Sequence, residues 1–314
     1  MGVFSLNFYV MKSKLLLFSL SIIVLSFGCK AQNVLASVEL EAENVTSVRI
    51  EGSFCDVVAK PGTTTYFKGM IEGSGDPDDY RIDTDIVGDE LVIEVKKRGG
   101  SWNRLSKSLL ELTIKNGVNL SVDNSSGNIE AGDIEAEKYS FEASSGDIDL
   151  EGVLGNMKVS TTSGDIEIRE ARGRLDVETT SGDQELENII GSLDFESTSG
   201  EVSIRGFECD IIGEATSGDI SLYDGSGMLK LRTTSGEIEG SRIKLTGDAE
   251  FRANSGDIEM ELANSLEEMS FDLEASSGDL RVGNRSGEDE LYIRNGGIWI
   301  RGITSSGSQR YTFD

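Results

Sequence analysis

The stretch Leu175-Asp176-Val177-Glu178-Thr179-Thr180-Ser181, followed by Gly182 and Asp183, decides the fold class of this 314-residue chain. Its side chains alternate with a period of two residues, which is typical of a β-strand with two different faces. Leu175, Val177 and Thr179 are predicted to share the inner face with Ser181. The glycine that follows suits a sharp bend, because glycine adopts backbone angles that other residues avoid.

The ending of this stretch, serine-glycine-acid-aliphatic, recurs through most of the chain. The glycines of the successive units are Gly127, Gly146, Gly164, Gly182, Gly200, Gly218, Gly236, Gly256, Gly278 and Gly296. The steps between them are 19, 18, 18, 18, 18, 18, 20, 22 and 18 residues. A period this regular is typical of architectures in which each unit packs on its neighbours.

An 18-residue unit is too long for one strand, so the chain must turn within each unit. The sequence therefore predicts an all-β fold, a single-chain parallel β-solenoid with about 18 residues per coil, in which equivalent residues form columns. Residues 116–314 are predicted to form the regular solenoid. Residues 32–115 alternate more loosely and are predicted to form irregular N-terminal β coils continuous with it.

The composition excludes several classes of function. The chain has 56 Asp and Glu against 29 Lys and Arg, a net charge of −27, and no histidine. Nucleic-acid binding is not expected, because phosphate contacts need clustered basic residues. Without histidine there is no Ser-His or Cys-His nucleophile pair and no histidine metal ligand.

The N-terminus predicts export from the cytoplasm. Residues 1–31 are interpreted as a signal peptide whose true start is Met11, with a basic segment followed by an apolar run. Two cleavage sites remain open. Cys29 would become the lipidated first residue of a lipoprotein, or cleavage after Ala31 would leave Gln32 first. Removal of residues 1–31 takes away three lysines and no acidic residue, which changes the net charge from −27 to −30.

One outward column is acidic and directly follows the corner glycines. It consists of Asp147, Asp165, Asp183, Glu201, Asp219, Glu237, Asp257 and Asp279. Carboxylate oxygens are ligands that Ca²⁺ prefers, so this column is a candidate cation ridge. The alternative is structural, because an aspartate after a glycine can accept hydrogen bonds from nearby backbone amides. The structural alternative is favoured, and no other metal ligand, cofactor or catalytic residue is predicted.

A neighbouring outward column is threonine-rich, with Thr162, Thr180, Thr198, Thr216 and Thr234. A flat threonine ladder could order water, but the column beside it, Glu178, Glu196, Glu214 and Arg232, makes this face charged. Trp299 points outward near the C-terminus and is expected to cap the last coil or contact a partner. Cys55 and Cys209 could form a disulfide or remain as two buried thiols.

The repeated Thr-Ser-Gly-Asp-Ile motif, over roughly residues 40–310, resembles the bacterial putative-adhesin family of β-strand repeats. That family has no known function and is related to auto-transporter-adhesin head domains. The resemblance implies a right-handed β-helix, an exported location and no known catalytic residues. The signal resembles those of Bacteroidetes envelope proteins. We therefore expect an outer-membrane lipoprotein, or a periplasmic or cell-surface protein, of a Gram-negative bacterium.

Three functions remain open. The first is a non-catalytic, adhesin-like interaction module that binds a surface protein or glycan and meets the membrane only through a lipid at Cys29. The second is a structural accessory of the envelope stress response. The third is a polysaccharide-active β-helix enzyme, which is disfavoured because the repeat leaves no loop long enough to wall a cleft.

Overall fold

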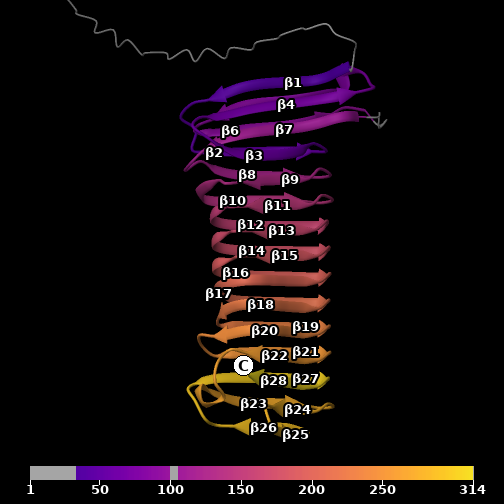
Figure 1. Ribbon diagram of the computed structural model, residues 1–314. Helices are drawn as coiled ribbons and strands as arrows, with labels where there is room; N and C mark the ends of the chain where they lie inside the picture. The colour runs from indigo at the N-terminus through magenta and orange to yellow at the C-terminus, as the bar shows by residue number, and fades with distance from the viewer. Residues whose placement is uncertain (1–32, 100–104, 314) are drawn as a thin grey trace, which may run out of the picture.

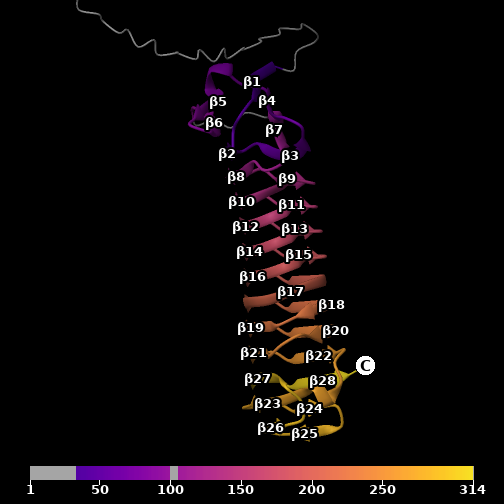
Figure 2. The same ribbon diagram turned by 90° about the vertical axis from the view of Figure 1, so that its left-hand side faces the viewer.

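Two ladders of strands face each other across an apolar core in the computed structural model, which describes residues 33–99 and 105–313 (Figures 1 and 2). The all-β class is confirmed, since the described residues contain no α-helix and only two 3₁₀ turns, η1 (Pro77–Asp79) and η2 (Leu266–Glu268). The predicted signal peptide, with Met11 and Cys29, lies outside the described residues.

The first ladder lies on the left in Figure 2. In their spatial order its strands are β5 (Tyr80–Val87), β6 (Glu90–Lys97), β2 (Ser47–Ser53), β8 (Asn119–Asn124), β10 (Glu135–Ala143), β12 (Leu154–Ser163), β14 (Arg172–Ser181), β16 (Ile190–Ser199), β17 (Val202–Ser217), β19 (Leu229–Ser235), β21 (Ala249–Ser255), β27 (Ile298–Ser306), β23 (Met269–Ala275) and β26 (Glu290–Ile293).

The second ladder runs beside it and shares the long strand β17. Its other strands are β1 (Asn33–Ala42), β4 (Thr65–Gly73), β7 (Leu105–Lys115), β3 (Asp56–Gly62), β9 (Ile129–Gly132), β11 (Ile148–Glu151), β13 (Ile166–Arg169), β15 (Gln184–Glu187), β18 (Ile220–Gly227), β20 (Ile238–Leu245), β22 (Ile258–Leu262), β28 (Gln309–Phe313), β24 (Leu280–Val282) and β25 (Arg285–Gly287).

The sheet is mixed, which corrects the prediction of a parallel sheet throughout. The pairs along the middle of both ladders are parallel, and Leu175 stands in register with Leu193. At the N-terminal end β1, β4 and β7 pair antiparallel, as do β5 and β6. At the other end β24 pairs antiparallel with β25, and β23 with β26. We call residues 119–313 the shaft.

The inner columns are apolar and closed to solvent. Leu175, Leu193, Ile211 and Leu229 stack in register and are at most 1% exposed. Thr179 is buried beside them, whereas Ser181 is exposed, because the backbone already bends there. The predicted inner face therefore ends at the threonine.

The first corner of each coil is the predicted glycine. Gly182 has a φ of +148°, and a Cβ added to it would lie 1.9 Å from the carbonyl oxygen of Gly164 in the preceding coil. No side chain fits such an approach, so the corners of neighbouring coils stack backbone on backbone.

A second corner has no sequence signature. It lies at Asp133, Gly152, Glu170, Asn188, Gly206, Asp224 and Arg242, where φ lies between +54° and +66°. This left-handed conformation disfavours most side chains, yet acidic, basic and amide residues all adopt it here. Stacking on both neighbours therefore imposes the bend on whatever residue falls there.

The last coil is inserted out of sequence order. β27 pairs parallel with both β21 and β23, and β28 with both β22 and β24 (Figure 1). The corner of this coil is Gly307, which stacks between Gly256 and Gly278. The predicted corner at Gly296 is wrong, because that residue lies in the loop before β27. Trp299 is also not a cap, because β27 is an interior strand.

At two places in the core, a large ring lies against a glycine of the next coil. The ring of Phe195 fills the space under Gly213, and that of Phe207 fills the space under Gly225. A Cβ on Gly213 would lie 2.1 Å from the Phe195 ring. The low aromatic content thus reflects a narrow interior, in which Phe195 and Phe207 each occupy space that a glycine of the next coil leaves free.

We predict that Gly213→Ala lowers the free energy of unfolding by about 1–3 kcal/mol, because the methyl group overpacks the core against Phe195. Adding Phe195→Leu should recover part of this loss, and a double-mutant cycle followed by chemical denaturation would measure the coupling. Gly132→Ala is the control, since the nearest atom to its added Cβ is 3.9 Å away. Additive effects of the two core substitutions would contradict this packing.

Candidate functional site

The acidic column forms a ladder of hydrogen bonds between coils. Asp165 Oδ1 accepts from the backbone amide of Asp183 at 2.9 Å, and Asp183 Oδ1 accepts from that of Glu201 at 2.8 Å. Asp219 bonds Glu237 in the same way at 2.8 Å. Asn128 takes the same role one coil earlier, bonding the amide of Asp147 at 3.1 Å. The role thus needs an oxygen acceptor and not a charge.

The predicted column is interrupted near its end. Ser308 of the inserted coil lies between Asp257 and Asp279, accepting from the Asp279 amide and donating its own amide to Asp257. The two carboxylates are therefore not neighbours. Within residues 33–99 and 105–313, no group of three or more metal-binding side chains comes together.

Glu237, in this column, has a raised carboxyl pKa. Desolvation, followed by the charges of Asp219, Glu239 and Asp257 and a hydrogen bond with Glu239, raises the pKa of its carboxyl. A raised pKa means that the protonated form is favoured in the folded state. This contribution to stability is therefore present at low pH and is lost as the pH rises through the folded-state pKa.

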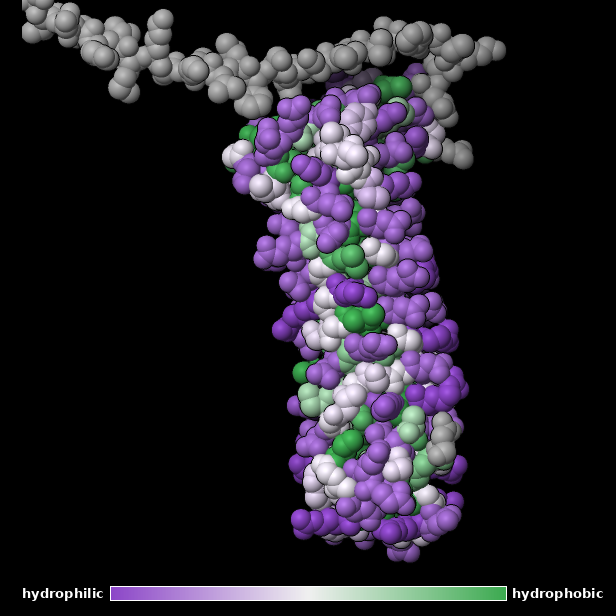
Figure 3. Space-filling view, turned by 60° about the vertical axis from the view of Figure 1, so that its left-hand side comes forward, coloured by the Kyte–Doolittle hydropathy of each residue, from purple (hydrophilic) through white to green (hydrophobic). Residues whose placement is uncertain are grey.

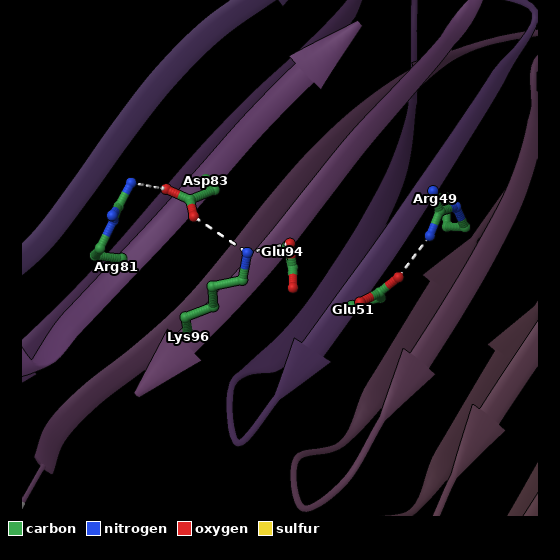
Figure 4. Close-up of polar contacts among 6 residues, drawn as sticks. All are labelled: Arg49, Glu51, Arg81, Asp83, Glu94 and Lys96. Atoms are coloured by element: carbon green, nitrogen blue, oxygen red, sulfur yellow. Dashed lines mark hydrogen bonds and ion pairs between the residues drawn. The ribbon is translucent and has the colours of Figure 1, made fainter. Parts of the chain in front are cut away.

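The outer face of the N-terminal strands carries a network of opposite charges (Figure 4). Asp83 on β5 lies 2.7 Å from Arg81 and 3.4 Å from Lys96 of β6, which also contacts Glu94 at 2.5 Å. The Glu94 carboxylate is the main cause of the raised pKa of the Lys96 ammonium. More than a third of each of these side chains is exposed, so the network is a solvated surface that contributes little stability.

Both described cysteines are free and buried. Desolvation, with smaller contributions from Asp56 and Asp210, raises the pKa of Cys55 and of Cys209 to about 12. Neither thiol is a nucleophile at neutral pH, since the thiolate is the reactive form. The structure therefore supports two buried thiols and not a disulfide between Cys55 and Cys209.

A shallow groove of about 230 Å³ lies on the outer surface of β17, β19 and β21. We call it the basic groove. Its lining residues are Ile212, Gly213, Glu214, Lys230, Leu231, Arg232, Glu250 and Arg252. Ile212 is 53% exposed, more than the other exposed aliphatic side chains of the shaft, Leu154, Ile190 and Met228. Figure 3 shows one face of the shaft, largely hydrophilic with hydrophobic patches along its middle.

The charges of the groove are only partly compensated. Arg252 pairs with Glu250 on its own strand. Among the described residues, Lys230 and Arg232 have no acidic side chain within ion-pair distance. Arg232 stands in register with Arg252 on one neighbouring strand and with Glu214 on the other. At the ladder spacing of about 4.8 Å, the repulsion between the two arginines and the attraction between Arg232 and Glu214 each amount to about 0.9 kcal/mol in water. With Lys230, the groove holds three cations and two acids, so a bound anion would be attracted by the excess positive charge.

The sequence contained a signal for this groove. The outward column Glu178, Glu196, Glu214 changes sign at Arg232, which the threonine-ladder hypothesis treated only as an interruption. Arg252 continues the change one coil later, where the step between glycines lengthens from 18 to 20 residues. The exposed threonines flank the groove column and make no flat uncharged face.

A model of the Toastrack DUF4097 family matches residues 93–208 and 190–296. The chain belongs to this family. The predicted resemblance to putative-adhesin β-repeat proteins of unknown function is thereby confirmed. No curated protein matches the sequence. In the part of the chain that the structure describes, no helix has the length and apolar character needed to span a membrane.

Several solved bacterial structures are similar to this member of the family. A putative adhesin from Bacteroides fragilis is 11% identical, with 88% of this chain and 96% of that one covered and a TM-score of 0.32. One from Parabacteroides merdae is 15% identical, with 71% and 95% covered and a TM-score of 0.32. A putative cell adhesion protein from Clostridium sporogenes is 9% identical, with 88% and 99% covered and a TM-score of 0.21. These TM-scores are low, so the assignment rests on the family match.

We predict that Asp183→Asn leaves stability unchanged, because the amide oxygen still accepts from the Glu201 amide. Asp183→Ala should lower the free energy of unfolding by up to about 1 kcal/mol, the usual value of one such bond. Thermal melting of both variants, with Ca²⁺ and with a chelator, is the measurement. If Ca²⁺ raised the melting temperature of the wild type but not of Asp183→Asn, the result would support the hypothesis that the acidic column binds cations.

Proposed function

We propose that this Toastrack protein is a non-catalytic, exported cell-envelope or surface protein that serves as an adhesin-like interaction module. The observation that carries the proposal is the basic groove, in which Lys230 and Arg232 have no ion-pair partner among the described residues and lie beside the exposed Ile212. Cations without an intramolecular ion-pair partner remain available for charge-assisted contacts with a ligand.

The proposal treats the fold as a right-handed solenoid of about 18 residues per coil. The coil size is supported by the recurrent register of 18 residues, as in the pairing of Val177 with Phe195, and the right hand is what the resemblance to the adhesin repeats implies. Such a stack holds outward side chains at fixed spacing along a rigid surface, which suits recognition by many weak contacts more than catalysis.

Several features favour binding over catalysis. Asp165, Asp183 and Asp219, which could have supplied an acid or a nucleophile, accept hydrogen bonds from backbone amides. Glu250 of the groove is held by Arg252. A glycoside hydrolase needs two carboxyl groups that flank a substrate in a cleft. Incubation with a panel of polysaccharides should therefore release no reducing or unsaturated ends.

The proposed location is the outer membrane or cell surface of a Gram-negative bacterium, with a lipid on Cys29. We expect mass spectrometry of the mature protein to find a lipid-modified Cys29 at its N-terminus, and Cys29→Ser to release the protein from the membrane fraction. A mature N-terminus at Gln32 in the wild type would show ordinary cleavage and exclude the anchor.

We predict saturable binding of the full mature protein, labelled with a fluorophore, to intact cells. The double variant Arg232→Gln and Arg252→Gln should bind about tenfold more weakly, since charge-assisted contacts are the stronger class of hydrogen bond. The control is Arg281→Gln with Arg310→Gln, which removes the same charge from neighbouring strands of the other ladder. Binding that is absent, or equally reduced in both variants, would refute the interaction role of the groove.

A further inference from the structure

The inserted strand β27 extends the basic groove toward the C-terminal end. Its register with β21 places Arg301 beside Glu250 and Ile303 beside Arg252. Both side chains point outward, because Ile300, Gly302 and Thr304 alternate with them and are buried. β19, β21 and β27 thus present Lys230, Arg232, Arg252 and Arg301 against one acid, Glu250.

This cluster reverses the charge of the surface on either side. In the same two outward columns, β14 and β16 carry Asp176, Glu178, Asp194 and Glu196, and β23 carries Asp272 and Glu274. Among β14, β16, β17, β19, β21, β27 and β23, it is β19, β21 and β27 that together carry more cations than acids in these two columns. Repulsion from the acids farther away is largely screened beyond about 8 Å at physiological ionic strength.

An aromatic pair lies at the end of the same face. Tyr292 on β26 is 62% exposed and outward, since it stands in register with Asp272. Trp299 on β27 is half-buried, and the two ring centroids lie 5.8 Å apart at an interplanar angle of 40°. Both rings lie outside the buried core. Aromatic side chains of this kind are favoured at binding sites for their large and rigid contact area.

The face is elongated in the direction of the stack. From β17 through β19, β21, β27 and β23 to β26, each strand is hydrogen-bonded to the next. Five steps of about 4.8 Å give a length of about 24 Å. A ligand that contacts both Ile212 and Tyr292 must therefore be a chain and not a single small molecule.

Two properties of the face select the kind of chain. A guanidinium is planar and binds a carboxylate through two parallel hydrogen bonds, which suits Arg232, Arg252 and Arg301. An exposed aromatic ring packs against the apolar C–H face of a sugar ring. Nucleic-acid bases also stack on aromatic rings, so single-stranded DNA is the alternative ligand that the experiment must exclude.

We propose that this face binds an acidic polysaccharide, with uronate carboxylates on the arginines of β19, β21 and β27 and a sugar ring on Tyr292 and Trp299. The proposal rests on the interaction function given above and names its ligand class. It predicts that affinity depends on the carboxylate charge of the glycan and falls with rising salt.

The test measures binding of the full mature protein to polygalacturonate and to its fully methyl-esterified form, which has the same backbone without the charge. We expect the ester to bind at least about tenfold more weakly, and Arg232→Gln with Arg252→Gln to weaken polygalacturonate binding by a similar factor. Tyr292→Ala should weaken the binding of both glycans, because the ring contacts the sugar and not the carboxylate. Arg281→Gln with Arg310→Gln should leave both affinities unchanged.

Melting temperatures of all variants would show whether each is folded. Equal affinity for the two glycans, tighter binding of single-stranded DNA, or loss of binding in the control variant would overturn the proposal. Groove-dependent binding to cells without binding to polygalacturonate would overturn the acidic-glycan assignment and leave the interaction function standing. Binding to neither cells nor glycan would refute both.

Discussion

The structure depends on the approach of one backbone corner to the next. At Gly182 the approach to Gly164 leaves no room for a Cβ, and the same contact recurs between Gly200 and Gly182 and between Gly218 and Gly200. This contact holds neighbouring coils at the spacing that strand hydrogen bonds require. Because it recurs without slippage, every residue in a coil faces its equivalent in the next, and columns of side chains follow.

Because equivalent residues stack in columns, each side chain must fit the equivalent side chains in the coils before and after it. Like charges repel along a column, and Asp183 offsets this repulsion by accepting a hydrogen bond from the backbone of the next coil. Inside, the ring of Phe195 is followed by Gly213, which leaves space for it. The glycines at the corners and beside these rings are therefore required by the stacking.

Sequence periodicity predicted those parts of the fold in which the same structural position is occupied by the same type of residue in successive coils. The glycine corner at Gly182 and the buried alternation of Leu175 and Val177 are of this kind. The second corner was missed because Glu170 and Arg242 share only a backbone conformation, which leaves no residue signature. The antiparallel pairs at both ends were missed because strand direction does not alter a period of two residues.

The candidate site was only half predictable for a related reason. Arg232 marks a change of sign that is visible in the sequence, but the insertion of β27 beside β21 is a long-range event. Counting residues placed Gly296 at the next corner, whereas Gly307 occupies it, so Arg301 and Trp299 fell in the wrong coil.

The position of β27 between β21 and β23 matters for function. The regular coil of β19 supplies Lys230 and Arg232. The out-of-order coil instead brings Arg301 beside β21 and Trp299 within ring contact of Tyr292. The combination of cations and aromatic rings on one face therefore arises where the chain departs from its repeat, and recognition is best sought at that departure.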